Sequence, residues 1–536
     1  NDYPLCYDLH FILVECEFLV SNYEKARTLA EALLHDAESP MEKAQICFLL
    51  SSQQMIHDFD YCIKMGLKGL GYCNIQIPEI SQIDEQLIEA EYQTVSSLLA
   101  QNNWGNGEDI LPSHPLSPEI SLAYRLYAQL AGACQIAGNA TLYRYIVYKG
   151  MRTVQESGLC EQAIIIYTMY NSTLTKYGHY LEANEVANIT INLLERYPLC
   201  ADAPFVYMAL GTFVWHYNHP LKQSVELQLK AYEIGYEYGD ITRGVFAGYS
   251  NSIINYFALG LPLNLLHAHL NKLDALLKRH RIDISAGSYY RCLTDMLTLP
   301  KAKNQLDASA FSVDEWQHIQ SCVLKPFLEH LQLQWFFWSD QTEAAWQAVL
   351  AAEPGLPQMS GFITSLEHRF IAALLASQQL PKADLKEQEL LNRIFNESLN
   401  ELKKLTSICP ENFEHKYLLL QAEYGRYQNT CVEQLAPLYE AAIESAATNG
   451  FLQYEALANE LYGTFWLDKK LPKMAEGCLK EALFLYQQWG CTLKVLNLST
   501  HYPQMLNDKP IESQAQASAQ QTLQRRSQNR TGINSQ

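Results

Sequence analysis

The stretch HYLEANEVANITINLL, residues 179–194, decides how the rest of the chain is interpreted. Steps of three, four and seven residues connect its recurring apolar positions, which are Tyr180, Ala183, Ala187 and Leu194. This spacing places them on one face of an α-helix. The short polar turn Gly178-His179 precedes the helix. Small alanines allow a second helix to approach closely, and the aromatic ring fills the wedge beside it.

Two other segments repeat this arrangement. NYEKARTLAEALL (22–34) follows Ser21-Asn22 and aligns Tyr23, Ala26, Ala30 and Leu33. KLPKMAEGCLKEALFLY (470–486) follows Lys469-Lys470 and aligns Leu471, Ala475, Leu479 and Ala482. Helical spacing dominates the chain, and strand-like alternation is rare. The sequence therefore predicts an all-α fold, an irregular tetratricopeptide-like α-solenoid of antiparallel helix pairs.

Further polar turns continue the series along the chain. They are His57-Asp58, Gly138-Asn139, Asn218-His219-Pro220, Gly260 with Pro262, and Ser339-Asp340. The steps from position 23 to 59, from 180 to 221 and from 221 to 261 are 36, 41 and 40 residues. These exceed the roughly 34 residues of an ideal tetratricopeptide repeat. We expect long, irregular repeats that stack imperfectly.

Composition shifts suggest a division into domains. A Gly-, Asn- and Pro-rich loop is predicted at 102–118, and a weaker polar break at 301–315. We predict N-terminal helical repeats at 1–101, central repeats at 119–300 and C-terminal repeats at 316–506. The Gln- and Ser-rich residues 507–536 are typical of a flexible linker or tail.

Bulk properties exclude several classes of protein. The net charge of −19 argues against a nucleic-acid partner, because phosphate binding requires clustered basic residues. No apolar run reaches the roughly 20 residues of a membrane span. Fourteen single cysteines without a Cys-x-x-Cys motif fit a reducing, cytoplasmic location. The start at Asn1-Asp2-Tyr3-Pro4 lacks Met and a signal sequence, which predicts a segment of a longer protein.

CPENFEHKYLLLQAEYGRY, residues 409–427, is the densest group of reactive side chains. Cys409, Glu411, Glu414 and His415 could form a catalytic cluster or simply open a helix. Pro410 suits the first turn of a helix, and carboxylates are favoured at its positive end. Helix-start chemistry accounts for these residues, so we favour that interpretation.

Histidine pairs and sequence motifs give no stronger enzymatic signal. His216 and His219 flank a turn, His267 and His269 point to different faces, and His318 with Cys322 is a lone pair. The glycine-rich MGLKGLGYC (65–73) is interpreted as a helix end, and no phosphate-loop, kinase or hydrolase motif occurs. We therefore predict no catalytic, cofactor-binding or metal-binding residue. The aromatic run Trp335–Trp338 is predicted to pack between helix layers rather than to face a partner.

Six segments in a fixed order carry a resemblance to a known family. They are KMGLKGLGYCNIQIPE (64–79), GTFVWHYNHPLKQS (211–224), GDITRGVFAGYS (239–250), CPENFEHKYLLLQAEYGR (409–426), NGFLQYEALANELYG (449–463) and LYQQWGCTLKVLNLSTHYPQML (485–506). Across about residues 5–506 the chain resembles the tetratricopeptide-like superhelix of bacterial multidomain signalling proteins. Those proteins join a serine/threonine kinase-like domain, a STAND-type AAA ATPase, the superhelix, and a GAF domain with a histidine kinase or another output.

The resemblance implies a cytoplasmic relay with ATP bound in an adjacent domain, and no nucleotide-binding residue of that family maps onto this chain. Only structural positions carry over, such as Pro220, Gly239-Asp240, Pro410-Glu411-Asn412 and Trp489-Gly490. We expect a non-catalytic scaffold or sensor that couples an upstream ATPase to a downstream output and binds a protein or a ligand. The alternatives are a fragment of a tetratricopeptide-ATPase transcription regulator, or an α/α-toroid glycan hydrolase with paired carboxylates in a central cleft.

Overall fold

The computed structural model describes residues 2–54, 58–102, 116–280, 289–298, 324–428 and 430–506. Every regular element in these ranges is helical, which confirms the all-α prediction. Several features named from the sequence lie outside the described residues. They are His318, Cys322, the break at 301–315, the tail 507–536 and most of the loop predicted at 102–118. The α-helices are α1 (Tyr3–Leu19), α2 (Tyr23–Asp36), α3 (Pro40–Gln54), α4 (Phe59–Tyr72), α5 (Glu85–Asn102), α6 (Pro118–Ile136), α7 (Ala140–Ser157), α8 (Ala163–Lys176), α9 (Tyr180–Arg196), α10 (Ala203–Phe213), α11 (Leu221–Tyr238), α12 (Tyr249–Ala258), α13 (Leu263–His280), α14 (Tyr289–Thr298), α16 (Leu324–Trp338), α17 (Thr342–Ala352), α18 (Ile363–Gln379), α19 (Leu385–Thr406), α20 (Pro410–Tyr427), α21 (Val432–Asn449), α22 (Leu452–Asp468), α23 (Pro472–Trp489), α24 (Thr492–His501) and α25 (Pro503–Leu506).

Left-handed residues close the predicted turns. Gly138, Gly178 and Asp340 have φ values of 73°, 82° and 60°, and each lies one or two residues before the next helix. After Gly178, the backbone N–H of His179 donates to the carbonyl of Leu174 at 2.9 Å. This hydrogen bond across five residues is the Schellman arrangement, which ends one helix and turns the chain into the next.

The small residues of the helical stripes are buried as predicted. Ala26, Ala30, Ala183 and Ala187 have no exposed surface, because neighbouring helices lie directly against them. One position differs from the prediction. Leu471 is 45% exposed, since α23 begins at Pro472 and Leu471 precedes the helix. Proline has a fixed φ suited to the first helical position, so it sets the start of α23 one residue later than the apolar pattern indicated.

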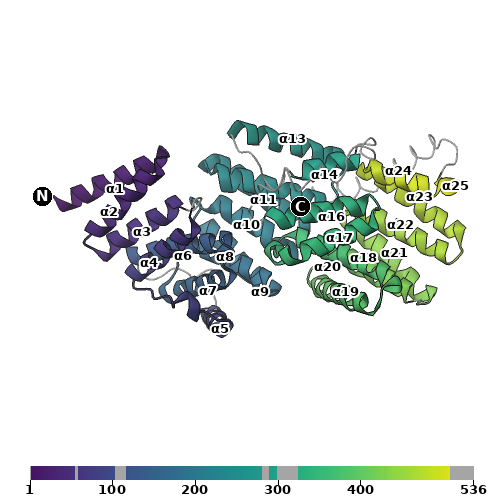
Figure 1. Cartoon of the computed structure of the whole chain (residues 1–536), viewed down its shortest axis with the longest axis horizontal. Helices are drawn as coiled ribbons and strands as arrows, with labels where there is room; N and C mark the ends of the chain where they lie inside the picture. The colour runs from purple at the N-terminus through teal and green to yellow at the C-terminus, as the bar shows by residue number, and fades with distance from the viewer. Residues whose placement is uncertain are drawn as a thin grey trace.

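Helices α1–α14 form a first array that packs mainly between neighbours in sequence. Helix α1 contacts α2, α2 contacts α3, and α3 contacts α4, and the series continues in this way through α6, α7, α8 and α9. Figure 1 shows the resulting elongated molecule, with α1 at one end and α23–α25 at the other. The repeat interval from Tyr180 to Leu221 is 41 residues and that from Leu221 to Leu263 is 42 residues, longer than an ideal tetratricopeptide repeat.

Helices α16–α25 form a second array that packs back onto the first. Helix α12 contacts α18, and α14 contacts α24, although these helices are far apart in sequence. The largest hydrophobic core accordingly contains residues of both arrays, from Tyr180 to Leu498. Two further cores belong to the first array alone. The fold is therefore an α-solenoid whose two halves share one interior.

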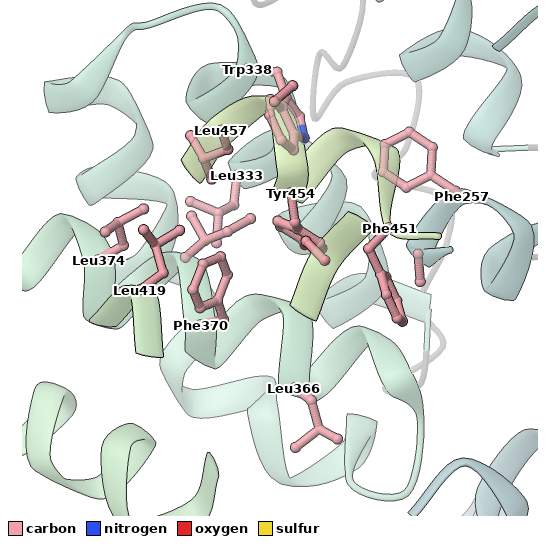
Figure 2. Close-up of a cluster of buried hydrophobic side chains, with 14 of the residues drawn as sticks. Phe257, Leu333, Trp338, Leu366, Phe370, Leu374, Leu419, Phe451, Tyr454 and Leu457 are labelled. Carbon is pink, nitrogen blue, oxygen red and sulfur yellow. The ribbon is translucent and has the colours of Figure 1, made fainter. Parts of the chain in front are cut away.

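Aromatic rings fill the centre of this shared core. Figure 2 shows Trp338, Phe370 and Tyr454 grouped between helices, with Phe257 of the first array nearby. The ring centroids of Phe370 and Tyr454 lie 5.4 Å apart in a T-shaped arrangement. Trp335 and Trp338 are 5% and 1% exposed, which confirms that the run 335–338 packs between layers.

Each helix that the structure describes is too short or too polar to cross a bilayer.

Candidate functional site

Asn412 forms the central contact between the two arrays. It lies in the first turn of α20, and its amide nitrogen donates to the carbonyls of His216 and His219, both at 2.8 Å. Its amide oxygen accepts from the N–H of Leu221 at 2.8 Å. Leu221 opens α11, where helix N–H groups lack partners within the helix. One buried side chain thus satisfies the backbone at the start of another helix 191 residues away.

Matching contacts lie on either side of Asn412. Lys404 donates to the carbonyl of Gly178 at 2.7 Å, and Tyr180 donates to Glu401. Further along, Gln453 donates to the carbonyl of Ala258 at 2.7 Å. We call this set of contacts the seam. On the side of the first array it comprises residues 178–180, 216–221 and 258–260, and on the side of the second array residues 401–404, 412 and 453. Its residue pairs are separated by 191–226 positions, and successive turns of the first array meet successive segments of the second.

A cleft of about 660 Å³ opens at one end of the seam. The end of α8 and the turn into α9 form one wall, and the beginning of α18 and the end of α19 form the other. Its size falls within the 300–1,000 Å³ that is usual for small-molecule sites. Because both arrays contribute walls, a ligand in this cleft would contact the two halves of the molecule at once.

The cleft contains cationic groups without carboxylate partners. Arg369 of α18 is half-buried and makes no hydrogen bond or ion pair with any residue that the structure describes. Lys176, at the end of α8, likewise has no carboxylate partner within the described ranges. Burial lowers the pKa of Lys176, and the nearby charge of Arg144 lowers it further. Positive charge in the cleft is therefore incompletely compensated by protein groups.

The two carboxylates of the cleft are already engaged. Glu401 accepts a hydrogen bond from Tyr180, and Glu397 lies 3.7 Å from the guanidinium of Arg393. Tyr180 stacks on Tyr217 with ring centroids 4.4 Å apart, and both rings are buried. Burial, followed by the charges of Tyr217 and Glu401, raises the pKa of Tyr180, so its phenol remains a hydrogen-bond donor. Both carboxylates and the Tyr180 phenol therefore already have partners within the protein.

A buried ion pair lies on α18 and α20 behind the cleft. Lys416 and Glu367 are 1% and 4% exposed, and their charged atoms are 3.1 Å apart. Glu367 also accepts from Tyr454, and Lys416 lies 3.1 Å from the ring nitrogen of His415. Burial raises the pKa of Glu367 and lowers that of Lys416, while their mutual attraction opposes both shifts. The pair fixes α20 against α18, the helix that carries Arg369.

The candidate cluster at 409–415 begins a helix, as predicted. α20 starts at Pro410 after Cys409, and Glu411 lies in its first turn. Burial raises the pKa of the Cys409 thiol to about 12, which leaves it protonated at neutral pH. Helix-start chemistry does not account for His415, however. It is 2% exposed and packs against Phe451 with ring centroids 4.4 Å apart, so it belongs to the buried cluster around Lys416.

The histidine pairs separate into different environments. His216 is fully buried, and neither of its ring nitrogens has a hydrogen-bond partner among the described residues, whereas His219 contacts the Asn184 side chain at 2.9 Å. His269 meets the Tyr249 hydroxyl, and His267 lies 3.5 Å from Asp295, which confirms that they occupy different faces. Across the described residues, no group of three or more His, Cys, Asp or Glu side chains is arranged to hold a metal ion.

No protein-family model matches the sequence, and no curated protein matches it either.

Sequence reasoning did not identify Arg369, Lys176 or the Glu367–Lys416 pair. Lys416 follows His415 in the stretch 409–427, which we interpreted from the residues of its first helical turn only. The sequence nevertheless contained a signal that Lys416 is buried. It lies one helical turn before Leu419 and Leu420 in an apolar stretch. Its acidic partner is 49 residues away on another helix, and no local pattern connects the two.

Proposed function

We propose that this chain is a non-catalytic superhelical scaffold that binds a ligand or a protein and couples neighbouring parts of a larger signalling protein. In this proposal the parent is a bacterial protein with a kinase-like domain and a STAND-type ATPase upstream and an output module downstream. The observation that carries the proposal is the seam. It adds directional polar contacts to the hydrophobic core that the two arrays share, so a shift at one end of the solenoid can be transmitted to the other.

The positions of the six family-like segments support this role. His216, His219 and Leu221 lie in the family-like segment GTFVWHYNHPLKQS. Asn412, which contacts all three, lies in the segment CPENFEHKYLLLQAEYGR. NGFLQYEALANELYG contains Gln453, which reaches Ala258. Three of the segments that define the resemblance therefore contribute to the contacts between arrays. A relay requires such contacts, whereas an enzyme requires a free nucleophile or base.

Substitution of Asn412 tests whether the seam is a coupling joint. In Asn412→Ala the N–H of Leu221 and two buried carbonyls lose their partners, and we expect a loss of about 3 kcal/mol at the seam. Hydrogen exchange at the start of α11 should accelerate. Asn459→Ala is the matched control, because Asn459 is also buried but bonds only to Glu455 within its own helix.

The decisive measurement uses the full-length parent protein. Small-angle scattering with and without ATP should give different profiles for the natural protein, and Asn412→Ala should reduce that difference while Asn459→Ala preserves it. Identical profiles with and without nucleotide in the natural protein would count against the relay. A nucleotide-dependent change that Asn412→Ala leaves intact would show that the seam is not the coupling element.

A further inference from the structure

The cleft at the seam combines uncompensated positive charge with a strongly acidic protein. The chain as a whole carries a net charge of −19, and its surface is therefore dominated by carboxylates. Within the cleft, however, Arg369 has no ion-pair partner among the described residues, and neither does Lys176. Both side chains line the cleft, so their charged groups are available to an anion that enters it. Such an arrangement indicates that an anion from outside completes the site.

The two carboxylates that line the cleft form no ion pair with Arg369 or Lys176 in the part of the chain that the structure describes. Glu401 is engaged by Tyr180, and Glu397 lies beside Arg393 at the rim. Lys404, a third cation in the cleft, bonds to the carbonyl of Gly178 and lies 4.8 Å above the ring of Tyr180. It therefore adds positive potential while its position is held by the seam. The cleft is lined by three basic and two acidic side chains, which leaves a formal excess of one positive group at its walls.

We propose that this cleft binds the oxyanion group, a phosphate or a carboxylate, of a small organic ligand, with Arg369 as the principal contact and Lys176 as the second cation. A guanidinium presents parallel N–H donors that match the two oxygens of such a group. The cleft volume of about 660 Å³ accommodates a small molecule around the anionic group and is too small for a folded partner. The inference rests on the proposed role as a ligand-binding scaffold and specifies the class of ligand.

The two cations belong to different arrays, which gives binding a structural consequence. Lys176 ends α8 in the first array, and Arg369 lies on α18 in the second. An anion that contacts both links the arrays beside the seam contact of Lys404 with Gly178. Because a ligand that binds only the folded arrangement of the two arrays stabilises it, binding should slow hydrogen exchange in residues 176–180.

The test measures binding of inorganic phosphate and of succinate by isothermal calorimetry at constant ionic strength, with chloride as the reference anion. We expect saturable binding of at least one of the two, and at least a tenfold weaker affinity in Arg369→Gln, because charge-assisted hydrogen bonds are the strong ones. Lys176→Gln should weaken binding less. Preference for phosphate or for succinate distinguishes the two kinds of oxyanion.

Arg125→Gln is the matched control. Arg125 lines a groove of similar size between α1, α3 and α6, and it likewise has no ion pair, although its guanidinium lies 4.2 Å from the ring of Phe48. This variant should bind as the natural protein does. Neither Arg369→Gln nor Arg125→Gln removes an ion pair, so both should fold, and circular dichroism checks this.

The proposal is overturned if neither anion binds more tightly than chloride, or if Arg125→Gln weakens binding as much as Arg369→Gln does. Because this experiment measures affinity alone, its failure leaves the nucleotide-dependent scattering test of the relay unaffected. Conversely, oxyanion binding without a nucleotide-dependent change of shape would support the site and contradict the relay.

Discussion

The helices α1–α7 and the block α16–α25 are made of similar hairpins but are held together differently. In α1–α7 each helix packs on helices one or two places away in sequence, and apolar side chains and alanines form most of the contacts. The block α16–α25 buries more charged and amide side chains, among them Lys416, Glu367 and Asn412, whereas α1–α7 buries Glu91 and Gln155. A single row of hairpins can leave its polar side chains in solvent, whereas a row packed on both sides must satisfy them internally.

The comparison teaches where specificity is stored in such a solenoid. Apolar wedges tolerate small shifts because dispersion and burial depend weakly on direction. Hydrogen bonds and buried ion pairs depend on distance and angle, so they fix one register between the two arrays. The first region should therefore respond mildly to loss of a polar contact, and the second severely.

The largest expected effect is the loss of the buried lysine. Lys416→Met leaves Glu367 buried without its cation, and we expect a loss of about 3–5 kcal/mol in the free energy of unfolding. The additional change Glu367→Gln should restore most of this loss, since glutamine can still accept from Tyr454. Tryptophan fluorescence during urea unfolding reports the block directly, because five of the eight tryptophans lie between residues 335 and 489.

An ion pair in the first array provides the control for this variant. Lys149 lies 3.6 Å from Glu91, which Arg152 also approaches at 3.4 Å, and both basic side chains are partly exposed. Glu91 is itself buried but keeps Arg152 as a partner in Lys149→Met, so this variant should cost only about 1 kcal/mol. Equal losses in Lys149→Met and Lys416→Met would contradict the distinction between the two regions.

Two glycines with the same backbone conformation give the next comparison. Gly138 and Gly260 have φ values of 73° and 72°, so alanine strains the left-handed backbone by about 1 kcal/mol at either position. A Cβ at Gly138 meets nothing within 4 Å, whereas at Gly260 it would lie 1.7 Å from the Gln453 side chain in the seam. Gly260→Ala should therefore lower the thermal midpoint by clearly more than Gly138→Ala, and similar shifts would mean that the seam yields easily.

Acid should weaken the shared core of the two arrays. Burial lowers the pKa of both His216 and His368 to about 3, from an ordinary value of 6.5. Between these values the unfolded chain binds a proton that the folded protein does not, so stability falls as the pH falls. Each histidine contributes a slope of about 1.4 kcal/mol per pH unit in this window.

Urea unfolding between pH 7 and pH 4 measures this slope. His216→Leu should reduce it by about the contribution of one histidine, because the side chain has no hydrogen-bond partner to lose. The raised pKa of Glu367 acts in the opposite direction, since that carboxyl gains protons more readily when folded. His35→Leu is the control, because His35 lies exposed on α2. An unchanged slope in His216→Leu would show that this imidazole accepts a proton in the folded state.

The helices and their turns were largely predictable because their determinants are local. The starts of α2, α9 and α20 lie at Asn22, His179 and Pro410, the first two directly before their helices and the third as the first helical residue. The candidate site was not predictable in the same way. Lys176 and Arg369 are separated by almost 200 residues, and nothing in the neighbourhood of either indicates the other.

The amino-acid sequence by itself determined that this chain is a series of helix pairs, since spacing, capping and small residues act over a few positions. Only the tertiary structure decided that the second array packs on the first, that Asn412 completes the start of α11, and that three cations share one cleft. The physical reason is that a polar side chain is specified by its partner in space, whereas an apolar stripe is specified by its own period.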